Sequence, residues 1–169
     1  MQRNLSVVVA MLGPAAFARV ACASCDRLFE ALDKADQQER VAMYLVETRD
    51  QPLPAKPLTV RIGKVVYDGS TAGNAFEAHQ TDGINPIMKA LRKAKQEGKV
   101  KCESAGSDSY RGQAAERFKF DNPLMPAQFN PTTLWVARSS GMPVYHEVKD
   151  FGGFVWHYGN AVRDPLVKR

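Results

Sequence analysis

The stretch from residue 132 to residue 158 reads TTLWVARSSGMPVYHEVKDFGGFVWHY. Runs rich in Val, Tyr, Phe and Trp alternate here with clusters of Gly, Ser and Pro, the residues that favour turns. We therefore predict strands over 132–138, 144–150 and 154–163, with a hairpin turn at 139–143. Strands joined by short turns pair antiparallel, so this end of the chain predicts an antiparallel sheet.

More strands are expected upstream of this stretch. Their ranges are 40–48, 58–62, 65–67, 76–79, 99–105 and 113–120. The last two are separated by a predicted hairpin turn at 106–112. Residues 51–57 contain three prolines, which remove the donors that a strand needs, so this segment predicts a loop.

Two segments show the periodicity of helices. Residues 26–38 place Leu, Phe and Ala side chains on one face, and Asp26 is a candidate for the N-cap. Residues 85–97 carry clearer signals. Asn85 suits the N-cap, the proline after it suits the first helical position, and Gly98 suits the end of the helix.

This order of elements predicts an α+β fold. The expected architecture is a curved antiparallel sheet, a half-barrel of about eight or nine strands, with the two helices packed on its concave face. The chain has 169 residues, of which 44% are hydrophobic, which suffices for one domain and its core. We expect that single domain to span residues 24–169.

Residues 1–23 have the layout of a secretory signal peptide. A basic start precedes about ten apolar residues, and small residues follow. Sites of the Ala-x-Ala type end at Ala18 and at Ala23, and both remain open. Export to the periplasm is predicted, with no membrane span after signal removal. The alternatives are a buried N-terminal helix over 5–18 and lipid attachment at Cys25.

Signal removal changes the charge of the chain. The whole sequence has 23 basic and 18 acidic residues, a net charge of +5. The signal carries Arg3 and, for the later cleavage site, Arg19, so the mature chain has a net charge of +4 or +3. The densest basic run, at 89–95, falls on a predicted helix, where it favours a solvated face over nucleic-acid binding.

The three cysteines, Cys22, Cys25 and Cys102, suit an oxidising compartment. Cleavage after Ala23 removes Cys22 and leaves an even pair, which makes a Cys25–Cys102 disulfide a candidate. Two free buried thiols are the alternative. A redox role for the Cys22-x-x-Cys25 spacing is disfavoured, because no strand precedes it.

Catalytic signatures are absent from the sequence. It has no Gly-x-Ser-x-Gly elbow, no phosphate-binding glycine loop before a helix and no His-Glu-x-x-His pair. A zinc site that uses His146 and His157 is a minor alternative, since both fall on neighbouring predicted strands. We therefore predict a protein without catalytic residues, metal or cofactor.

Aromatic and methionine side chains suggest a different kind of site. Phe154, Trp156 and Tyr158 alternate along one strand and so share a face. Packing between sheet and helices is the plain interpretation. The sharper one is a cavity for an apolar ligand, because two short helices fill a curved sheet only partly. Its expected lining is Met43, Leu45, Met88, Leu91, Phe118, Phe120, Trp135, Tyr145, Trp156 and Tyr158.

Several segments resemble a known group. Residues 134–147 resemble the strand, Gly-hydrophobic-Pro turn and strand of bacterial lipoprotein-sorting proteins of the LolA and RseB type. Residues 61–69, 102–114 and 158–165 resemble further hairpins of small exported proteobacterial proteins of this type. The resemblance implies a periplasmic half-barrel that accommodates acyl chains or lipoproteins. This chain is shorter than the full carriers, which implies a smaller cavity.

Two functions follow as hypotheses. The first is a non-enzymatic periplasmic binding module that holds an acyl chain, lipid or lipopeptide between sheet and helices. The second is a protein-interaction or envelope-stress sensor domain that meets another envelope protein. An apolar ligand or a lipoprotein is the expected partner in the first case, and neither case involves nucleic acid.

Overall fold

The computed structural model describes residues 15–69, 76–81 and 85–165, with side chains from residue 23 onward. These residues form two α-helices and one nine-stranded antiparallel sheet with the order β4-β3-β2-β1-β9-β8-β7-β6-β5. The helices are α1 (Ala15–Asp36) and α2 (Pro86–Gln96). The strands are β1 (Arg40–Val46), β2 (Thr59–Ile62), β3 (Val65–Asp68), β4 (Glu77–Gln80), β5 (Cys102–Tyr110), β6 (Gln113–Phe120), β7 (Thr132–Ala137), β8 (Pro143–Val148) and β9 (Gly152–Tyr158).

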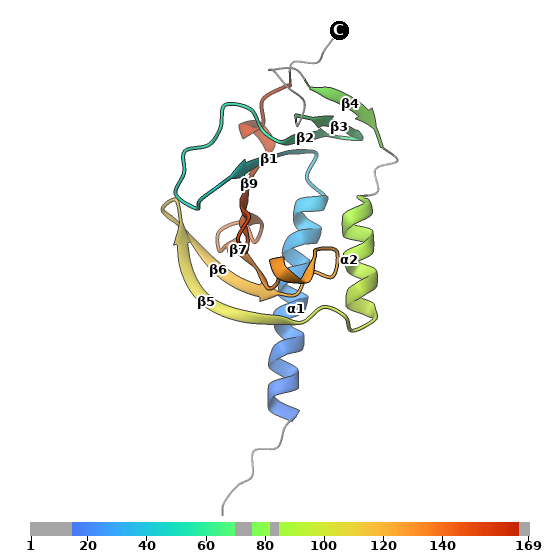
Figure 1. Cartoon of the computed structure of the whole chain (residues 1–169), viewed down its shortest axis with the longest axis vertical. Helices are drawn as coiled ribbons and strands as arrows, with labels where there is room; N and C mark the ends of the chain where they lie inside the picture. The colour runs from blue at the N-terminus through green and yellow to red at the C-terminus, as the bar shows by residue number, and fades with distance from the viewer. Residues whose placement is uncertain (1–14, 70–75, 82–84, 166–169) are drawn as a thin grey trace, which may run out of the picture.

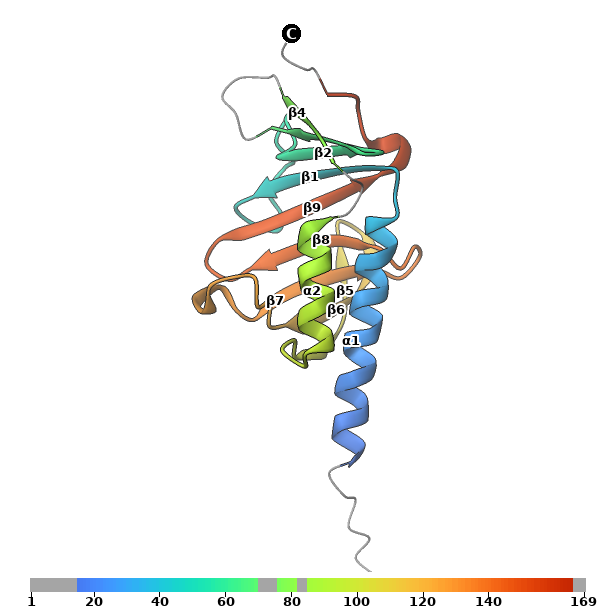
Figure 2. The ribbon, with the colours of Figure 1, turned by 90° about the vertical axis from the view of Figure 1, so that its right-hand side faces the viewer.

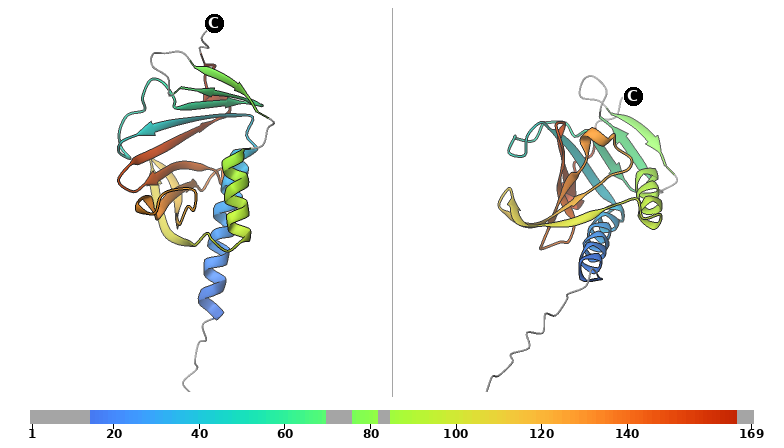
Figure 3. Two further views of the ribbon diagram at one scale, coloured as in Figure 1. Left: turned by 45° about the vertical axis from the view of Figure 1, so that its right-hand side comes forward. Right: turned by 60° about the horizontal axis from the view of Figure 1, so that its bottom comes forward.

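Both helices cover the same face of the sheet (Figure 2). Alternation along each strand sends every second side chain to this face. Phe118 on β6 and Leu134 on β7 are cross-strand partners there, and both pack against Leu28 of α1. The sheet is curved and open, as Figure 3 shows, so the predicted α+β class and the curved antiparallel sheet are confirmed.

The opposite face carries a second core beneath the bent β5–β6 hairpin (Figure 1). Tyr110, at the end of β5, stacks on Tyr145 of β8 with ring centroids 4.9 Å apart. The hairpin is held over this face by Asp108, which pairs with Arg49 at 3.0 Å. The backbone N–H of Ser109 and the Arg49 guanidinium together lower the pKa of Asp108 to about 2. The bend therefore encloses aromatic rings that would otherwise face water.

Two strand ends differ most from the sequence predictions, those of β5 and β9. The turn expected over 106–112 is wrong, because β5 continues through it and the turn is only Arg111–Gly112, both at positive φ. Gly106, at φ 82°, lies instead at an irregularity in the β5–β6 register. Strand β9 ends at Tyr158, five residues before the expected end at 163, because a 3-10 turn follows at Gly159–Ala161.

The start of the first helix also differs. Helix α1 begins at Ala15 and not at residue 26, so Asp26 is no N-cap. Its carboxylate instead accepts a hydrogen bond from Lys95 of α2 at 2.7 Å. The first turns of α1 extend past the sheet (Figure 1). Among the residues whose side chains are described, from residue 23 onward, Ser24 and Cys25 are the first that are buried. Most of the predicted signal, residues 1–14, lies outside the described residues.

A disulfide joins α1 to the first residue of β5. Cys25 and Cys102 are bonded, with their Cα atoms 5.1 Å apart and a sequence separation of 77 residues. Both cysteines belong to the core between helices and sheet. A search of the described helices finds no segment long and apolar enough to cross a membrane.

Candidate ligand-binding site

A groove of about 290 Å³ lies between the helices and the sheet. The last turn of α1 and the first turn of α2 lie beside β1 and β9, and the groove forms there. Strands β2–β4 extend beyond these two helix turns (Figure 2). Its surface is mostly apolar. The full lining is Leu32, Ala35, Asp36, Val41, Met43, Thr59, Val60, Arg61, Val66, Thr81, Asn85, Pro86, Ile87, Met88 and Trp156.

Sheet register builds the floor of the groove. Met43 of β1 lies opposite Trp156 on one side and Thr59 on the other, so these three side chains share a face. Val41 and Val66 reach the same face through their pairings with Arg61 of β2. Three strands from the first part of the chain, β1, β2 and β3, and the distant strand β9 therefore supply one continuous apolar surface.

The first turn of α2 forms one wall. The Asn85 side chain accepts hydrogen bonds from the backbone N–H groups of Ile87 and Met88, at 3.1 and 3.3 Å. This cap fixes the direction in which the helix starts. Met88 is buried against the core, whereas Ile87 is 61% exposed at the rim. An apolar side chain with that exposure marks the open side of the groove.

Charged contacts hold the other wall, the end of α1. The Arg61 guanidinium donates to the carbonyls of Ala35 and Asp36, at 3.3 and 2.9 Å. Arg92 of α2 contacts the carboxylates of Asp33 and Asp36, at 2.7 and 3.1 Å. The Asp33 hydrogen bond raises the pKa of Arg92. The two helix ends are thus tied to each other and to β2 by polar contacts.

The predicted cavity residues fall into several groups. Met43, Met88 and Trp156 line the groove. Leu45 continues the floor beside its cross-strand partner Phe154, but it is 39% exposed and lies outside the groove.

Four more lie away from the groove. Leu91, Phe118 and Phe120 are buried between helices and sheet. Tyr158 is part-buried, and its hydroxyl donates to the Pro143 carbonyl at 2.8 Å.

Trp135 and Tyr145 lie on the opposite face of the sheet, so the structure does not bring them to the groove. They are cross-strand partners, and Leu134 takes the helix side of β7 instead. Sequence reasoning missed Val41, Thr59 and Val66. For Val41 a signal was available, because Val41 and Met43 are two residues apart on one strand and so share a face.

The two C-terminal histidines cannot share a metal. His146 pairs with Phe154 on the helix face, whereas His157, three residues further along β9, faces the other way and contacts Tyr44. No group of three or more potential metal ligands occurs among the described residues. His146 stacks on Phe120, its Nε2 is enclosed without a partner, and burial lowers its pKa to about 4.

No protein-family model and no curated protein sequence matches this chain. Solved structures do. MucB superposes with a TM-score of 0.48 at 11% identity, over 87% of this chain and 66% of MucB. The Mycobacterium tuberculosis lipoprotein LppX superposes with a TM-score of 0.44 at 15% identity, over 86% of this chain and 97% of LppX.

Proposed function

We propose that the protein is a non-enzymatic binding module for an apolar ligand, a single acyl chain, held in the groove between the helices and the sheet. The observation that carries this proposal is the floor made by Val41, Met43, Val66 and Trp156 beneath an open rim at Ile87. Apolar surface of this kind gains free energy when a hydrocarbon displaces water from it.

The volume limits the cargo. An apolar cavity of about 150 Å³ holds one benzene molecule. The groove, at about 290 Å³, has roughly twice that space. It therefore accepts about ten to twelve carbon atoms by the same comparison. One acyl chain of that length fits, and a complete triacylated lipoprotein anchor does not.

Burial energetics give the expected affinity. About ten methylenes contribute on the order of 8 kcal/mol. Loss of ligand freedom costs at least about 4 kcal/mol. The remainder corresponds to a dissociation constant of about 1 mM. Arg61 is the cation that lines the groove, and a contact with an anionic head group would strengthen binding about tenfold.

The test is quenching of tryptophan fluorescence by a brominated decanoic acid, with the chain from Ser24 to Arg169. Trp156 lines the groove and Trp135 does not, so quenching should disappear in Trp156→Phe. Ile87→Lys places a charge at the rim and Val66→Trp fills the floor. We expect each to weaken binding at least fivefold. Leu124→Lys is the matched control, since Leu124 is 46% exposed on the β6–β7 loop. Equal quenching in all these proteins would contradict the proposal.

We further propose that the protein is exported to the periplasm and that its mature chain begins at Ser24. Ser24 and Cys25 are buried against the domain, while the first turns of the helix extend past the sheet (Figure 1). The disulfide supports an oxidising compartment, and removal of Cys22 leaves the two bonded cysteines as the full set. N-terminal sequencing of the secreted protein should read Ser-Cys-Asp-Arg. A start at Arg19 would select the other site, and an intact N-terminus would contradict export.

A further inference from the structure

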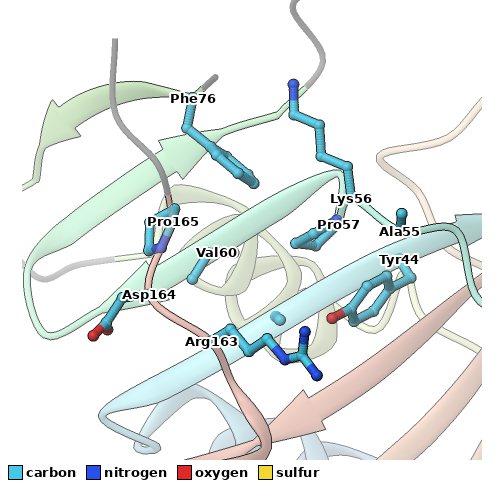
Figure 4. Close-up of a pocket in the computed structure, with 10 residues that line it drawn as sticks. Tyr44, Ala55, Lys56, Pro57, Val60, Phe76, Arg163, Asp164 and Pro165 are labelled. Atoms are coloured by element: carbon cyan, nitrogen blue, oxygen red, sulfur yellow. The ribbon is translucent and has the colours of Figure 1, made fainter. Parts of the chain in front are cut away.

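A second pocket, of about 300 Å³, lies on the face of the sheet opposite the groove (Figure 4). It is bounded by β1, β2, the proline-rich segment before β2 and the chain that follows β9. The lining combines an apolar base with cations at the rim. Ala42 and Val60 form its base, and both are fully buried. Since this face points away from both helices, the pocket is separate from the groove.

The backbone at Gly69 packs closely against Pro57 and the Phe76 ring, and this packing shapes one wall of the pocket. A Cβ atom on Gly69 would lie 2.3 Å from the Pro57 carbonyl oxygen and 2.8 Å from the Phe76 ring. Gly69 also donates its N–H to the Leu58 carbonyl at 2.8 Å. The absence of a side chain at 69 therefore lets the Phe76 ring, which is 5% exposed, close against Pro57. The result is a flat aromatic wall with a rigid backbone behind it.

Arg163 supplies a positive charge, and its backbone is fixed on both sides. Arg40 of β1 donates to the Val162 carbonyl at 2.9 Å and pairs with the Asp164 carboxylate at 2.6 Å. Val162 is itself buried in the core beneath the pocket. Among the described residues, the Arg163 side chain has no hydrogen bond or ion pair. The neighbouring carboxylate is thus neutralised by Arg40, while the Arg163 guanidinium keeps its charge.

Two further groups complete the rim. In Figure 4 the Tyr44 hydroxyl and the Arg163 guanidinium point toward one another across the pocket. Both groups can donate hydrogen bonds to the two oxygens of one carboxylate. On the other wall, the Lys56 ammonium lies 5.0 Å from the centre of the Phe76 ring. The pocket therefore has hydrogen-bond donors at one end and an aromatic wall at the other.

We propose that this pocket binds a carboxylate attached to a compact apolar body, with the carboxylate at Arg163 and Tyr44 and the body against the wall that Phe76 and Pro57 form. Charge complementarity selects the carboxylate, because a guanidinium and a phenol match its two acceptor oxygens. Two sources share this chemistry: a small aromatic acid and the C-terminal end of a peptide with an apolar last residue. The volume of about 300 Å³ admits either body.

Isothermal titration calorimetry with 3-phenylpropionate tests the proposal. Arg163→Gln and Tyr44→Phe should each weaken binding, the former about tenfold, the effect of one charge-assisted hydrogen bond. The matched control is Arg138→Gln, since Arg138 lies in the β7–β8 turn and donates to Ser107. Replacing 3-phenylpropionate by its amide should abolish binding to the wild-type protein. Binding of the amide with equal affinity would overturn the proposal.

A second comparison separates this pocket from the groove. Binding of 3-phenylpropionate should be unchanged in Ile87→Lys, the variant that blocks the groove. Loss of binding in Ile87→Lys together with normal binding in Arg163→Gln would place the probe in the groove and overturn the second site. N-acetylphenylalanine distinguishes the sources: tighter binding than 3-phenylpropionate assigns the pocket to peptide C-termini, and weaker binding assigns it to small aromatic acids.

Discussion

Protonation of His146 should make the protein less stable in mild acid. The imidazole lies between Phe120 and Phe154, and its enclosed Nε2 has no partner. Burial lowers its pKa from 6.5 to about 4 in the folded state. The unfolded chain therefore binds a proton between these values that the folded chain does not, and stability falls as pH falls through this window.

The magnitude follows from the two pKa values. Relative to pH 8, linkage predicts a loss of about 2 kcal/mol at pH 5 and about 3 kcal/mol at pH 4. The residue as a whole is only half-buried, so these two losses are upper values. Other groups also titrate in this range, and the effect of His146 alone is the difference between the wild-type protein and His146→Leu.

Urea unfolding at a series of pH values measures this difference. The stability of His146→Leu should depend less on pH than that of the wild type between pH 6.5 and 4, so the wild type should lose more stability than the variant as pH falls. His79→Gln is the control, because His79 lies exposed on the edge strand β4. An NMR titration of the wild-type protein gives an independent reading. Parallel pH profiles, or a His146 resonance that titrates near 6.5, would refute the reasoning.

Three further changes have clear expected outcomes. Reduction of the Cys25–Cys102 bond, or its replacement by two serines, should lower the free energy of unfolding by about 4 kcal/mol, since the bond closes a long loop; equal urea midpoints with and without reductant would count against this. Asn85→Ala removes the cap of α2 and should cost about 1 kcal/mol in the same assay. Gly153→Ala places a Cβ 2.4 Å from the Tyr145 ring and should cost about 1–3 kcal/mol, while an unchanged melting temperature would show that the ring can move aside.

Local sequence signals predicted where helices and strands lie better than they predicted which face of the sheet each side chain occupies. The Asn85 cap and Gly98 define α2 because capping chemistry acts over a few residues. By contrast, Leu134 and Trp135 belong to a run of apolar residues without alternation, all buried. Such a run does not reveal which side chain meets the helices. The face of Trp135 is set by its pairing with Tyr145, a long-range contact.

The groove depends even more on long-range pairing, which local sequence does not reveal. Its floor depends on β9 pairing with β1, which joins Trp156 to Met43 across more than half of the chain. Neither residue carries a local mark of that pairing. Met43 and Met88, which the sequence predicted at a cavity, both lie at the groove, because amphipathic periodicity points them toward the core side. The partners that complete the floor, such as Val66, follow only from strand order.

The middle of α1 and its C-terminal end are held by interactions of different strength, and this bears on how the groove receives a ligand. The middle of the helix, at Cys25, is bonded covalently to β5. The end at Asp36 is held by Arg61 and Arg92 through polar contacts, and the side chains of Arg92 and Asp33 are 42% and 40% exposed. Partly exposed ion pairs contribute only about 0–1 kcal/mol each. Displacing the Asp36 end therefore costs little compared with displacing the helix at Cys25. Because the groove lies at the weakly held end, its width can adjust to a bound chain while the core around the disulfide stays closed.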